Sequence, residues 1–399
     1  MKTTILWTAL LGLSFASYAL TLEEAVELAR KNSPRLKAAQ TRTSAAEKAV
    51  SASGLWKNPT LNFSTDGVGG DHDGFREAGF EVMLKQTFPM GGKRSLDRQV
   101  SRRATDVAVH SRAVSELQLL SEVRHAFIDV FSQQEIGVIR AEQEQLGRAF
   151  VNVAKSRYES GGGSELDVVQ AELLMAEVLL SQTCCFGDLE AARIGLASLM
   201  GVPEPDLKEL TGDYYELVDI EDQLLADSHP VLMRMNAQVE KLRAKASRAR
   251  ASDSADITLG AGVKYEAAEG VNTFTLSASM PLNFVRGGRA AEAAALLDME
   301  ALSAEYDEVR RESQQRLSQL IAQYRGAKME ADILAEQLVP KAQEAYEVIK
   351  AGYEAGRFSW VELIRAQQHL ADVRVRNVEA LRDAHFAQTE IKKFMKEEL

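Results

Sequence analysis

The sequence predicts a mainly α-helical protein with a small β part, in which a unit of one β-hairpin and one long helical hairpin occurs twice. In each half, two segments alternate apolar and polar residues with a period of two, as strands do. A helical run far longer than the average of about 12 residues follows each pair. Shifted by about 195 residues, the chain also matches itself over its whole length. The matches are Pro34-Arg35-Leu36 with Pro230-Val231-Leu232, Gly91-Gly92-Lys93 with Gly287-Gly288-Arg289, and Tyr158-Glu159-Ser160-Gly161 with Tyr353-Glu354-Ala355-Gly356.

The amino terminus has the pattern of a secretory signal peptide. Residues 4 to 15 are mostly apolar, and Ser17 and Ala19 place small residues where a signal peptidase reads them. We expect residues 1–19 to be removed, so that the mature chain begins near Leu20. Because residue 20 is not cysteine, no lipid anchor is expected there. No later apolar run approaches the roughly 20 residues that a spanning helix needs, so a membrane would have to be crossed by another route.

Composition argues against several functional classes. The chain has 47 basic and 58 acidic side chains and a net charge of −11, which argues against nucleic acid as a partner. Cys184 and Cys185 are adjacent in a helical stretch, and we expect buried small residues rather than a disulfide or a redox pair. The sequence has no nucleophile elbow, phosphate-binding loop or zinc signature, so we predict neither catalysis nor a cofactor.

The first repeat is expected to cover residues 20–205. Its elements are expected to be helices at about 21–31 and 34–53, strands at about 59–66 and 79–88, and long helices at about 93–157 and 164–200. In the second strand, Phe80, Val82 and Leu84 alternate with mostly polar residues. The first long helix contains no proline and repeats apolar pairs seven residues apart, which predicts a rod of about 100 Å.

The second repeat is expected to cover residues 206–399 in the same order. Its elements are expected to be strands at about 256–266 and 272–282 and long helices at about 288–355 and 359–396. Pro340 interrupts the first of these helices. Because proline removes one backbone donor and crowds the preceding turn, we predict a bend near Val339.

The four strands have a wholly apolar face and a small or polar face, as in a transmembrane β-barrel, although a soluble β-sandwich shows a similar alternation. Four strands cannot close a barrel, which needs about eight. An open sheet in lipid would leave edge N–H and C=O groups without partners, so the chain must oligomerise. Two copies would leave no channel, and the geometry leaves three or four copies open.

Tight turns join the predicted elements. The strands pass into the long helices through a proline and a glycine pair, namely Pro89, Gly91 and Gly92 in one repeat and Pro281, Gly287 and Gly288 in the other. Glycines break each long helix near Gly161 and Gly356. Ser164 and Ser359 then begin the return helices, with Asp167 and Glu362 three residues on, which is the capping-box pattern.

The repeated order of helix, hairpin, long helix, tip turn and return helix resembles the TolC family of outer-membrane efflux proteins over essentially the whole mature chain. The tips carry the resemblance: Arg157-Tyr158-Glu159-Ser160-Gly161 leading into Ser164-Glu165-Leu166-Asp167, and Gly352-Tyr353-Glu354-Ala355-Gly356 leading into Ser359-Trp360-Val361-Glu362. The segment Gln86-Thr87-Phe88-Pro89-Met90-Gly91-Gly92-Lys93-Arg94 looks most like the CzcC and CusC branch, which serves heavy-metal efflux.

This resemblance implies a homotrimer with a twelve-stranded barrel in the outer membrane of a Gram-negative bacterium and an α-helical barrel in the periplasm. The implied partners are a periplasmic adaptor, or membrane fusion protein, an inner-membrane pump of the RND type, and outer-membrane lipid. The chain would be an exit duct, either for heavy-metal cations or, as the alternative, for multidrug efflux or type I protein secretion. A periplasmic coiled-coil adaptor or scaffold is the rival class, but an adaptor would have only one helical hairpin.

The resemblance also assigns roles at the tips. Acidic side chains there narrow the periplasmic mouth, and the matching positions are Asp167 and Glu362; plain helix capping explains them equally well. Arg365 stands where some relatives carry a further acid, which argues against a doubled acidic ring. We expect the tip turns to contact the adaptor through Tyr158, Gly161, Ser164, Leu166, Tyr353, Gly356, Ser359 and Val361.

Two further groups have more than one interpretation. Asp71-His72-Asp73, in a glycine-rich loop, is a weak set of metal ligands and fits a solvated turn better, so no metal site is predicted. Basic residues border the barrel, and they could bind anionic lipid headgroups or pair with acids on adjoining helices. They are Lys93, Arg94, Arg98, Arg102 and Arg103 in one repeat and Arg243, Lys245, Arg248 and Arg250 in the other.

Overall fold

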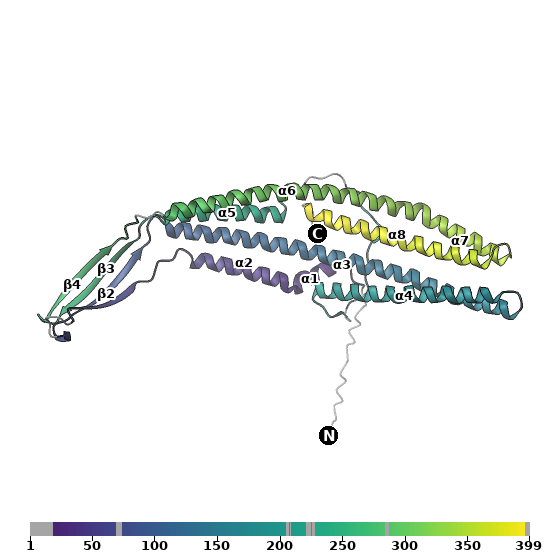
Figure 1. Cartoon of the computed structure of the whole chain (residues 1–399), viewed down its shortest axis with the longest axis horizontal. Coiled ribbons are helices and arrows are strands. Elements are labelled where there is room, and N and C mark those ends of the chain that lie inside the picture. The colour runs from purple at the N-terminus through teal and green to yellow at the C-terminus, as the bar shows by residue number, and fades with distance from the viewer. Residues whose placement is uncertain are drawn as a thin grey trace, which may run out of the picture.

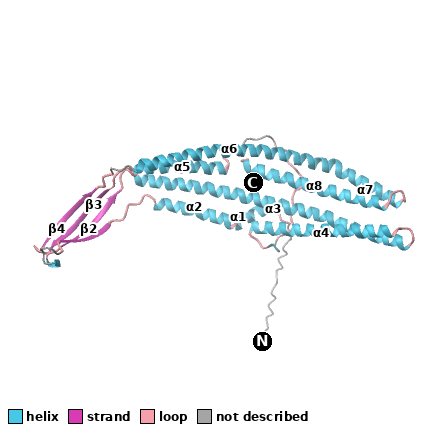
Figure 2. Cartoon of the chain, in the orientation of Figure 1, coloured by secondary structure: helices cyan, strands magenta, loops and turns pink. Residues whose placement is uncertain are grey.

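The computed structural model describes residues 19–68, 74–204, 207, 209–220, 225, 228–283 and 287–395. The molecule is long and slender, with strands at one end, helices along its length, and two helix-to-helix turns at the other end (Figure 1). Figure 2 shows that strands and long helices occupy separate parts of the long axis. The predicted fold class, two units of hairpin and helical hairpin, is confirmed.

Two short helices open the chain. α1 (Leu22–Asn32) begins with a capping box, in which the Thr21 hydroxyl accepts the N–H of Glu24 and the Glu24 carboxylate accepts the N–H of Thr21. α2 (Pro34–Ala52) has proline at its first position, where the missing N–H costs nothing. α5 (Pro230–Ala251) is its counterpart in the second repeat and also begins with proline.

The four strands form one antiparallel sheet in the order β1-β2-β3-β4. The strands are β1 (Thr60–Asp66), β2 (Gly79–Phe88), β3 (Ile257–Glu266) and β4 (Val271–Ser279). A short 3-10 helix, η1 (Gly74–Arg76), precedes β2. β4 ends three residues before the predicted residue 282, because Pro281 has no N–H to continue the ladder.

The first helical hairpin consists of α3 (Lys93–Glu159) and α4 (Glu165–Met200). The second consists of α6 (Gly287–Ile333), a π-helical segment η3 (Leu334–Leu338), α7 (Val339–Glu354) and α8 (Trp360–Phe394). Where the sequence predicted a bend near Val339, the structure has this π-helical turn. Its wider winding accommodates the proline ring and the missing donor of Pro340 while the helix continues.

Hydrophobic clusters lie one after another along the helices rather than in a single central core. The cluster at the tips joins both repeats, with Phe150 and Leu174 from the first and Trp360 and Leu363 from the second. Residues 209–220, which lie between the repeats, pack against the helices through Tyr214, Leu217 and Ile220. There the Tyr214 hydroxyl donates to the Val378 carbonyl at 2.9 Å, and burial raises the pKa of Tyr214.

α4 corrects one expectation drawn from the sequence. Within the described residues, it is the one helix that is long and apolar enough to cross a membrane, by length and composition alone. Only 22% of its most apolar stretch is buried within the chain, because much of its apolar surface faces away from the hairpin. The pair of cysteines divides accordingly. Cys185 is buried as expected, whereas Cys184 points outward and is exposed.

Candidate conduit from the strand sheet to the helical tips

The sheet has two faces of opposite character. Phe274 and Leu276 of β4 are 90% and 85% exposed, which a sheet in water would not favour. The opposite face is small and polar, and Lys264 there forms ion pairs with Asp66 at 2.9 Å and Glu266 at 2.6 Å. The cross-strand rows of the apolar face are Phe63, Val82, Val263, Phe274 and Leu61, Leu84, Ala261, Leu276; those of the polar face are Asn62, Met83, Gly262, Thr275 and Ser64, Glu81, Lys264, Thr273.

Both edges of the sheet are open. β1 pairs only with β2 and β4 pairs only with β3, so the outer backbone groups of β1 and β4 lack strand partners in the described chain. Joined to strands of other copies, the same edges would close a cylinder with its apolar face outward and its polar face inward.

The transitions from strand to helix are tightly constrained. Gly91 and Gly92 have left-handed φ angles of 67° and 72°, which residues with a Cβ rarely adopt. A Cβ on Gly91 would lie 2.4 Å from the Ser254 hydroxyl oxygen. In the second repeat, the N–H of Gly288 donates to an Asp253 carboxylate oxygen at 2.7 Å. A Cβ on Gly287, by contrast, would meet nothing within 4 Å.

Asp256, the residue before β3, ties the transition of the first repeat to the second repeat. Its carboxylate accepts from the Lys93 ammonium at 2.6 Å and from the Met90 N–H at 3.3 Å. Partial burial works against ionisation, but these bonds and one from Lys57 hold the pKa of Asp256 below its ordinary value. The start of α3 is therefore fixed against the start of β3.

At the opposite end, both tip turns have the same hydrogen bonding. The N–H of Gly162 donates to the Arg157 carbonyl, and the N–H of Arg357 donates to the Gly352 carbonyl, each at 2.8 Å. Gly161 and Gly356 occupy the left-handed position at φ 75° and 74°. Each long helix thus ends in a Schellman motif, which positions the return helix beside it.

The predicted capping boxes are present in both repeats. The N–H of Ser164 donates to Asp167 at 3.0 Å, and the N–H of Ser359 donates to Glu362 at 2.7 Å. This bond, followed by the Ser359 hydroxyl and Arg365, holds the pKa of Glu362 below its ordinary value. Glu362 and Arg365 are exposed, and Asp167 is half-buried. Glu362 therefore remains charged at the tip.

One contact at the tips was not anticipated. The Arg157 guanidinium at the end of α3 donates to the Tyr353 hydroxyl at 2.7 Å and lies 4.7 Å from the centre of its ring. The Tyr353 ring lies 5.5 Å from that of Trp360. Arg157 was part of the tip motif, but nothing in the sequence indicated that the ends of the two hairpins would touch through it.

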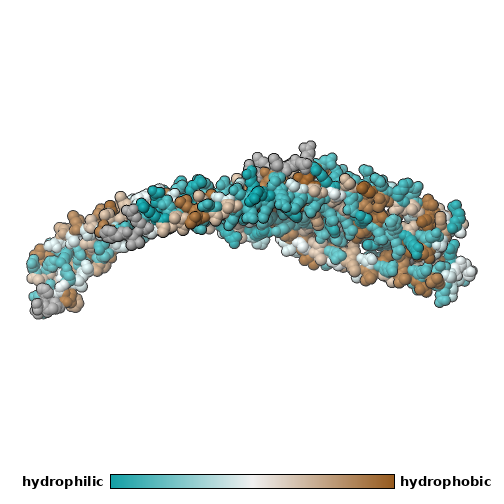
Figure 3. Space-filling model, turned by 45° about the horizontal axis from the view of Figure 1, so that its top comes forward, coloured by the Kyte–Doolittle hydropathy of each residue, from teal (hydrophilic) through white to brown (hydrophobic). Residues whose placement is uncertain are grey.

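The residues expected to contact an adaptor lie at the tip surface. Tyr158, Gly161, Ser164, Gly356 and Ser359 are exposed there, while Tyr353 and Val361 are half-buried. Leu166 begins a row of exposed apolar side chains on α4, opposite the face that packs on α3. The row comprises Leu166, Val169, Leu173, Leu180 and Ile194. Figure 3 shows hydrophobic surface on the half of the helical part that lies farther from the sheet.

The expected metal-free turn Asp71-His72-Asp73 and most of the predicted signal peptide lie outside the described residues. In the described ranges, no group of three or more His, Cys, Asp or Glu side chains could hold a metal ion.

A comparison with protein families agrees with this geometry. The sequence pattern of the family described as "Outer membrane efflux protein" matches residues 25–202 and, again, residues 222–395. The chain belongs to this family. The two matched stretches correspond to the two structural repeats, and membership of the outer membrane efflux proteins places the chain in the outer membrane as an efflux channel.

Individual relatives match much or nearly all of the chain. The cobalt-zinc-cadmium resistance protein CzcC of Cupriavidus metallidurans is 22% identical over 388 residues, which are 95% of this chain and 91% of CzcC. The pyoverdine export outer membrane protein OpmQ of Pseudomonas putida is 24% identical over 63% of this chain and 57% of OpmQ. The crystal structure of CusC superposes with a TM-score of 0.77 at 14% identity, covering 93% and 90% of the two chains.

Proposed function

We propose that this outer membrane efflux protein is the exit duct of a tripartite efflux system and works as a homotrimer. Four strands from each of three copies make twelve, which enclose a water-filled lumen, whereas eight strands from two copies do not. The observation that carries the proposal is the open sheet with one apolar and one polar face. Closure by sister copies removes the several kcal/mol that each unpaired edge group costs in hydrocarbon.

The helical tips would meet a periplasmic adaptor, with an inner-membrane pump of the RND type as the source of energy. Exposed Leu166 and half-buried Val361, beside rigid glycine turns, offer an apolar surface to the end of an adaptor hairpin. In this proposal the chain performs no chemistry of its own and conducts substrate passively.

The proposed substrates are heavy-metal cations. Three observations support this class: the relative named for cobalt, zinc and cadmium resistance is matched over 91% of its length, the net charge is −11, and the polar sheet face carries carboxylates such as Glu81. The relative named for pyoverdine export makes a small organic substrate the alternative.

A deletion strain tests the substrate class. Loss of the chain is expected to raise sensitivity to Co²⁺, Zn²⁺ or Cd²⁺, and expression of the wild-type chain to restore growth. Unchanged metal sensitivity together with increased sensitivity to antibiotics, or loss of siderophore export, would reject metal efflux and leave the duct itself in place.

We also propose that the tips form a gate that opens when contacts between the two hairpins break. The bond from Arg157 to Tyr353 supports this, because it joins the end of α3 to the end of α7 and lies close to Asp167. Opening one hairpin away from the other would require this bond to be lost.

The Tyr353→Phe variant removes the acceptor of that bond and keeps the ring and both capping boxes. We expect a higher single-channel conductance in planar bilayers, and a higher one again when Asp167→Ala and Glu362→Ala are added. Tyr158→Phe is the matched control, because Tyr158 holds the equivalent place in the first repeat and is exposed. Equal conductance of the two tyrosine variants would reject the gating role of the bond.

A further inference from the structure

The basic residues near the barrel divide into two groups in the structure. Most have partners: Lys93 pairs with Asp256, Arg103 with Asp106, Arg248 with Asp97 and Arg250 with Glu292. Arg98 and Arg102 of α3 differ, as does Lys245 of α5, because these residues are exposed and none pairs with a carboxylate in the part of the chain that the structure describes.

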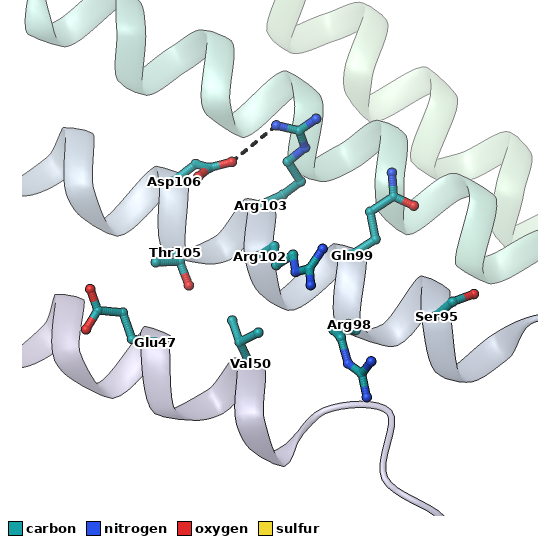
Figure 4. A pocket seen from close by; sticks show the side chains of 9 residues that line it. All are labelled: Glu47, Val50, Ser95, Arg98, Gln99, Arg102, Arg103, Thr105 and Asp106. Carbon is teal, nitrogen blue, oxygen red and sulfur yellow. Dashed lines mark hydrogen bonds and ion pairs between the residues drawn. The ribbon is translucent and has the colours of Figure 1, made fainter.

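Arg98 and Arg102 line a groove of 880 Å³ between α2 and α3. In Figure 4 the Arg98 side chain reaches from α3 toward α2, with Arg102 one turn along the same helix, whereas Arg103 points the other way and bonds to Asp106. Thr105 and Ser95 add hydroxyl groups, and Val50 of α2 adds apolar surface. Glu47 is the one carboxylate of the lining that is not engaged by Arg103, so the groove remains positively charged.

A chain of contacts places this groove on the lipid side of the molecule. Phe88 ends β2 on the same face as Phe80 and Val82, and the Trp56 ring packs edge-on against it with centroids 5.5 Å apart. The Arg94 guanidinium lies 3.9 Å from the centre of the Trp56 ring and donates to the Gly54 carbonyl at 2.8 Å. Arg94 is therefore fixed on the side of the molecule that continues the apolar face of the sheet. It lies beside Trp56 at the level of the membrane–water interface, where tryptophan side chains are enriched.

Arg98 and Arg102 continue the line of Arg94. On a helix, each step of four residues turns the side chain by about 40° and moves it about 6 Å along the axis. The three arginines therefore lie on the same side of α3. Arg98 and Arg102 lie about 6 and 12 Å beyond Arg94, toward the periplasm. The polar headgroup layer of a bilayer is about 5–8 Å thick, and long arginine side chains can reach back to it.

We propose that Arg98 and Arg102 bind the phosphate of an anionic phospholipid in the periplasmic leaflet of the outer membrane. The positive charges of Arg98 and Arg102, one helical turn apart, repel each other, and an anion bound between them replaces this repulsion with two attractions. A guanidinium also presents paired donors that match phosphate oxygens.

This inference rests on the membrane placement of the sheet and is independent of the transported substrate. The test uses purified protein in vesicles and the fluorescence of Trp56, which is 53% exposed beside the groove. Trp360 lies at the far tips and stays beyond the reach of lipid (Figure 1). Two vesicle preparations contain the same mixture of phosphatidylglycerol and phosphatidylcholine. In one only the phosphatidylglycerol is brominated, and in the other only the phosphatidylcholine. Stronger quenching of Trp56 in the first preparation measures a preference for the anionic lipid around this residue.

We expect the wild type to prefer phosphatidylglycerol to phosphatidylcholine, and each arginine to raise the relative affinity for phosphatidylglycerol roughly fivefold. The Arg98→Gln/Arg102→Gln variant is expected to lose this preference. Arg42→Gln/Arg112→Gln removes the same charge from exposed positions on the same two helices, farther from the strands, and is expected to keep it.

An equal loss in both variants, or no preference in the wild type, would overturn the headgroup site and leave the duct unaffected. Abolition of the preference by inorganic phosphate would assign the groove to a soluble anion and also overturn the proposal. Failure of both lipids to quench Trp56 would overturn it together with the membrane placement.

Discussion

Gly262 of β3 lies directly opposite Met83 of β2, at the line where the two repeats meet in the sheet. The strands are so close that a Cβ on Gly262 would be 2.6 Å from the Val82 carbonyl oxygen and 3.0 Å from the Met83 Cα. Within the described sheet, the hairpins of the two repeats are joined by the pairing of β2 with β3. This close approach of the two strands therefore keeps both hairpins in one continuous sheet.

The Gly262→Val variant is therefore expected to weaken the sheet, although valine favours strands elsewhere. Forcing extra atoms into this contact should cost about 1–3 kcal/mol and lower the yield of membrane-inserted, heat-resistant oligomer on gels. Thr275→Val alters the same polar row on β4 without adding volume, and we expect it to assemble like the wild type. Normal assembly of Gly262→Val would show that the strands can separate freely there.

Acid should weaken the helical part through Glu390. The His125 ring nitrogen lies 2.8 Å from its carboxylate, Lys393 lies equally close, and together they lower the pKa of Glu390 from 4.5 to about 2. Because the folded state holds the charged form, the added stability is complete above pH 4.5 and disappears as the pH falls toward 2. Because solvent screens this half-buried carboxylate, the contribution at neutral pH is about 1–2 kcal/mol.

Unfolding followed by circular dichroism checks this prediction. Glu390→Gln should lower stability at neutral pH and lose less between pH 4.5 and 2 than the wild type does. Glu379→Gln, at an exposed position of the same helix, should leave both the stability and its pH dependence unchanged. Parallel acid curves for Glu390→Gln and the wild type would contradict the assignment.

Two glycines in long helices should respond oppositely to alanine. A Cβ on Gly352 would lie 2.1 Å from the Phe358 ring, whereas a Cβ on Gly137 would meet nothing within 4 Å. We expect Gly137→Ala to stabilise the helix by about 0.5–1 kcal/mol and Gly352→Ala to destabilise the tip by about 1–2 kcal/mol. In a Phe358→Ala background, Gly352→Ala should become harmless, and a double-mutant cycle of thermal unfolding measures this coupling.

The order of elements could be predicted because each depends on local signals. Alternation marked the strands, the capping boxes of Ser164 and Ser359 marked the return helices, and glycines marked the tips. Departures from the expected elements have local causes too, since Pro281 shortens β4 and Pro340 is accommodated by a π-helical turn.

Contacts between the repeats could not be predicted in this way. Arg157 and Tyr353 are almost two hundred residues apart, and neither side chain has an unusual neighbour in sequence. The division of the basic cluster into paired and unpaired arginines likewise depends on which helices pack together, as Arg248 with Asp97 illustrates. The overall apolar character of α4 was missed because its apolar residues are spread around the helix rather than consecutive.

That row on α4 leads to a prediction about assembly. Leu173 is 60% exposed and points away from Leu174 and Val178, which lie about 100° and 140° farther around α4 and pack inside the hairpin. In the proposed trimer this surface would be covered by a neighbouring copy, since large apolar areas seldom remain in contact with water.

Leu173→Glu is expected to convert the detergent-purified trimer to monomers in mass photometry, because a carboxylate would be buried without a partner at the contact. Leu173→Met keeps the volume and the apolar character, so it should remain trimeric. If the glutamate variant also remained trimeric, the row would not be a contact between copies, and the apolar surface of α4 would need another partner.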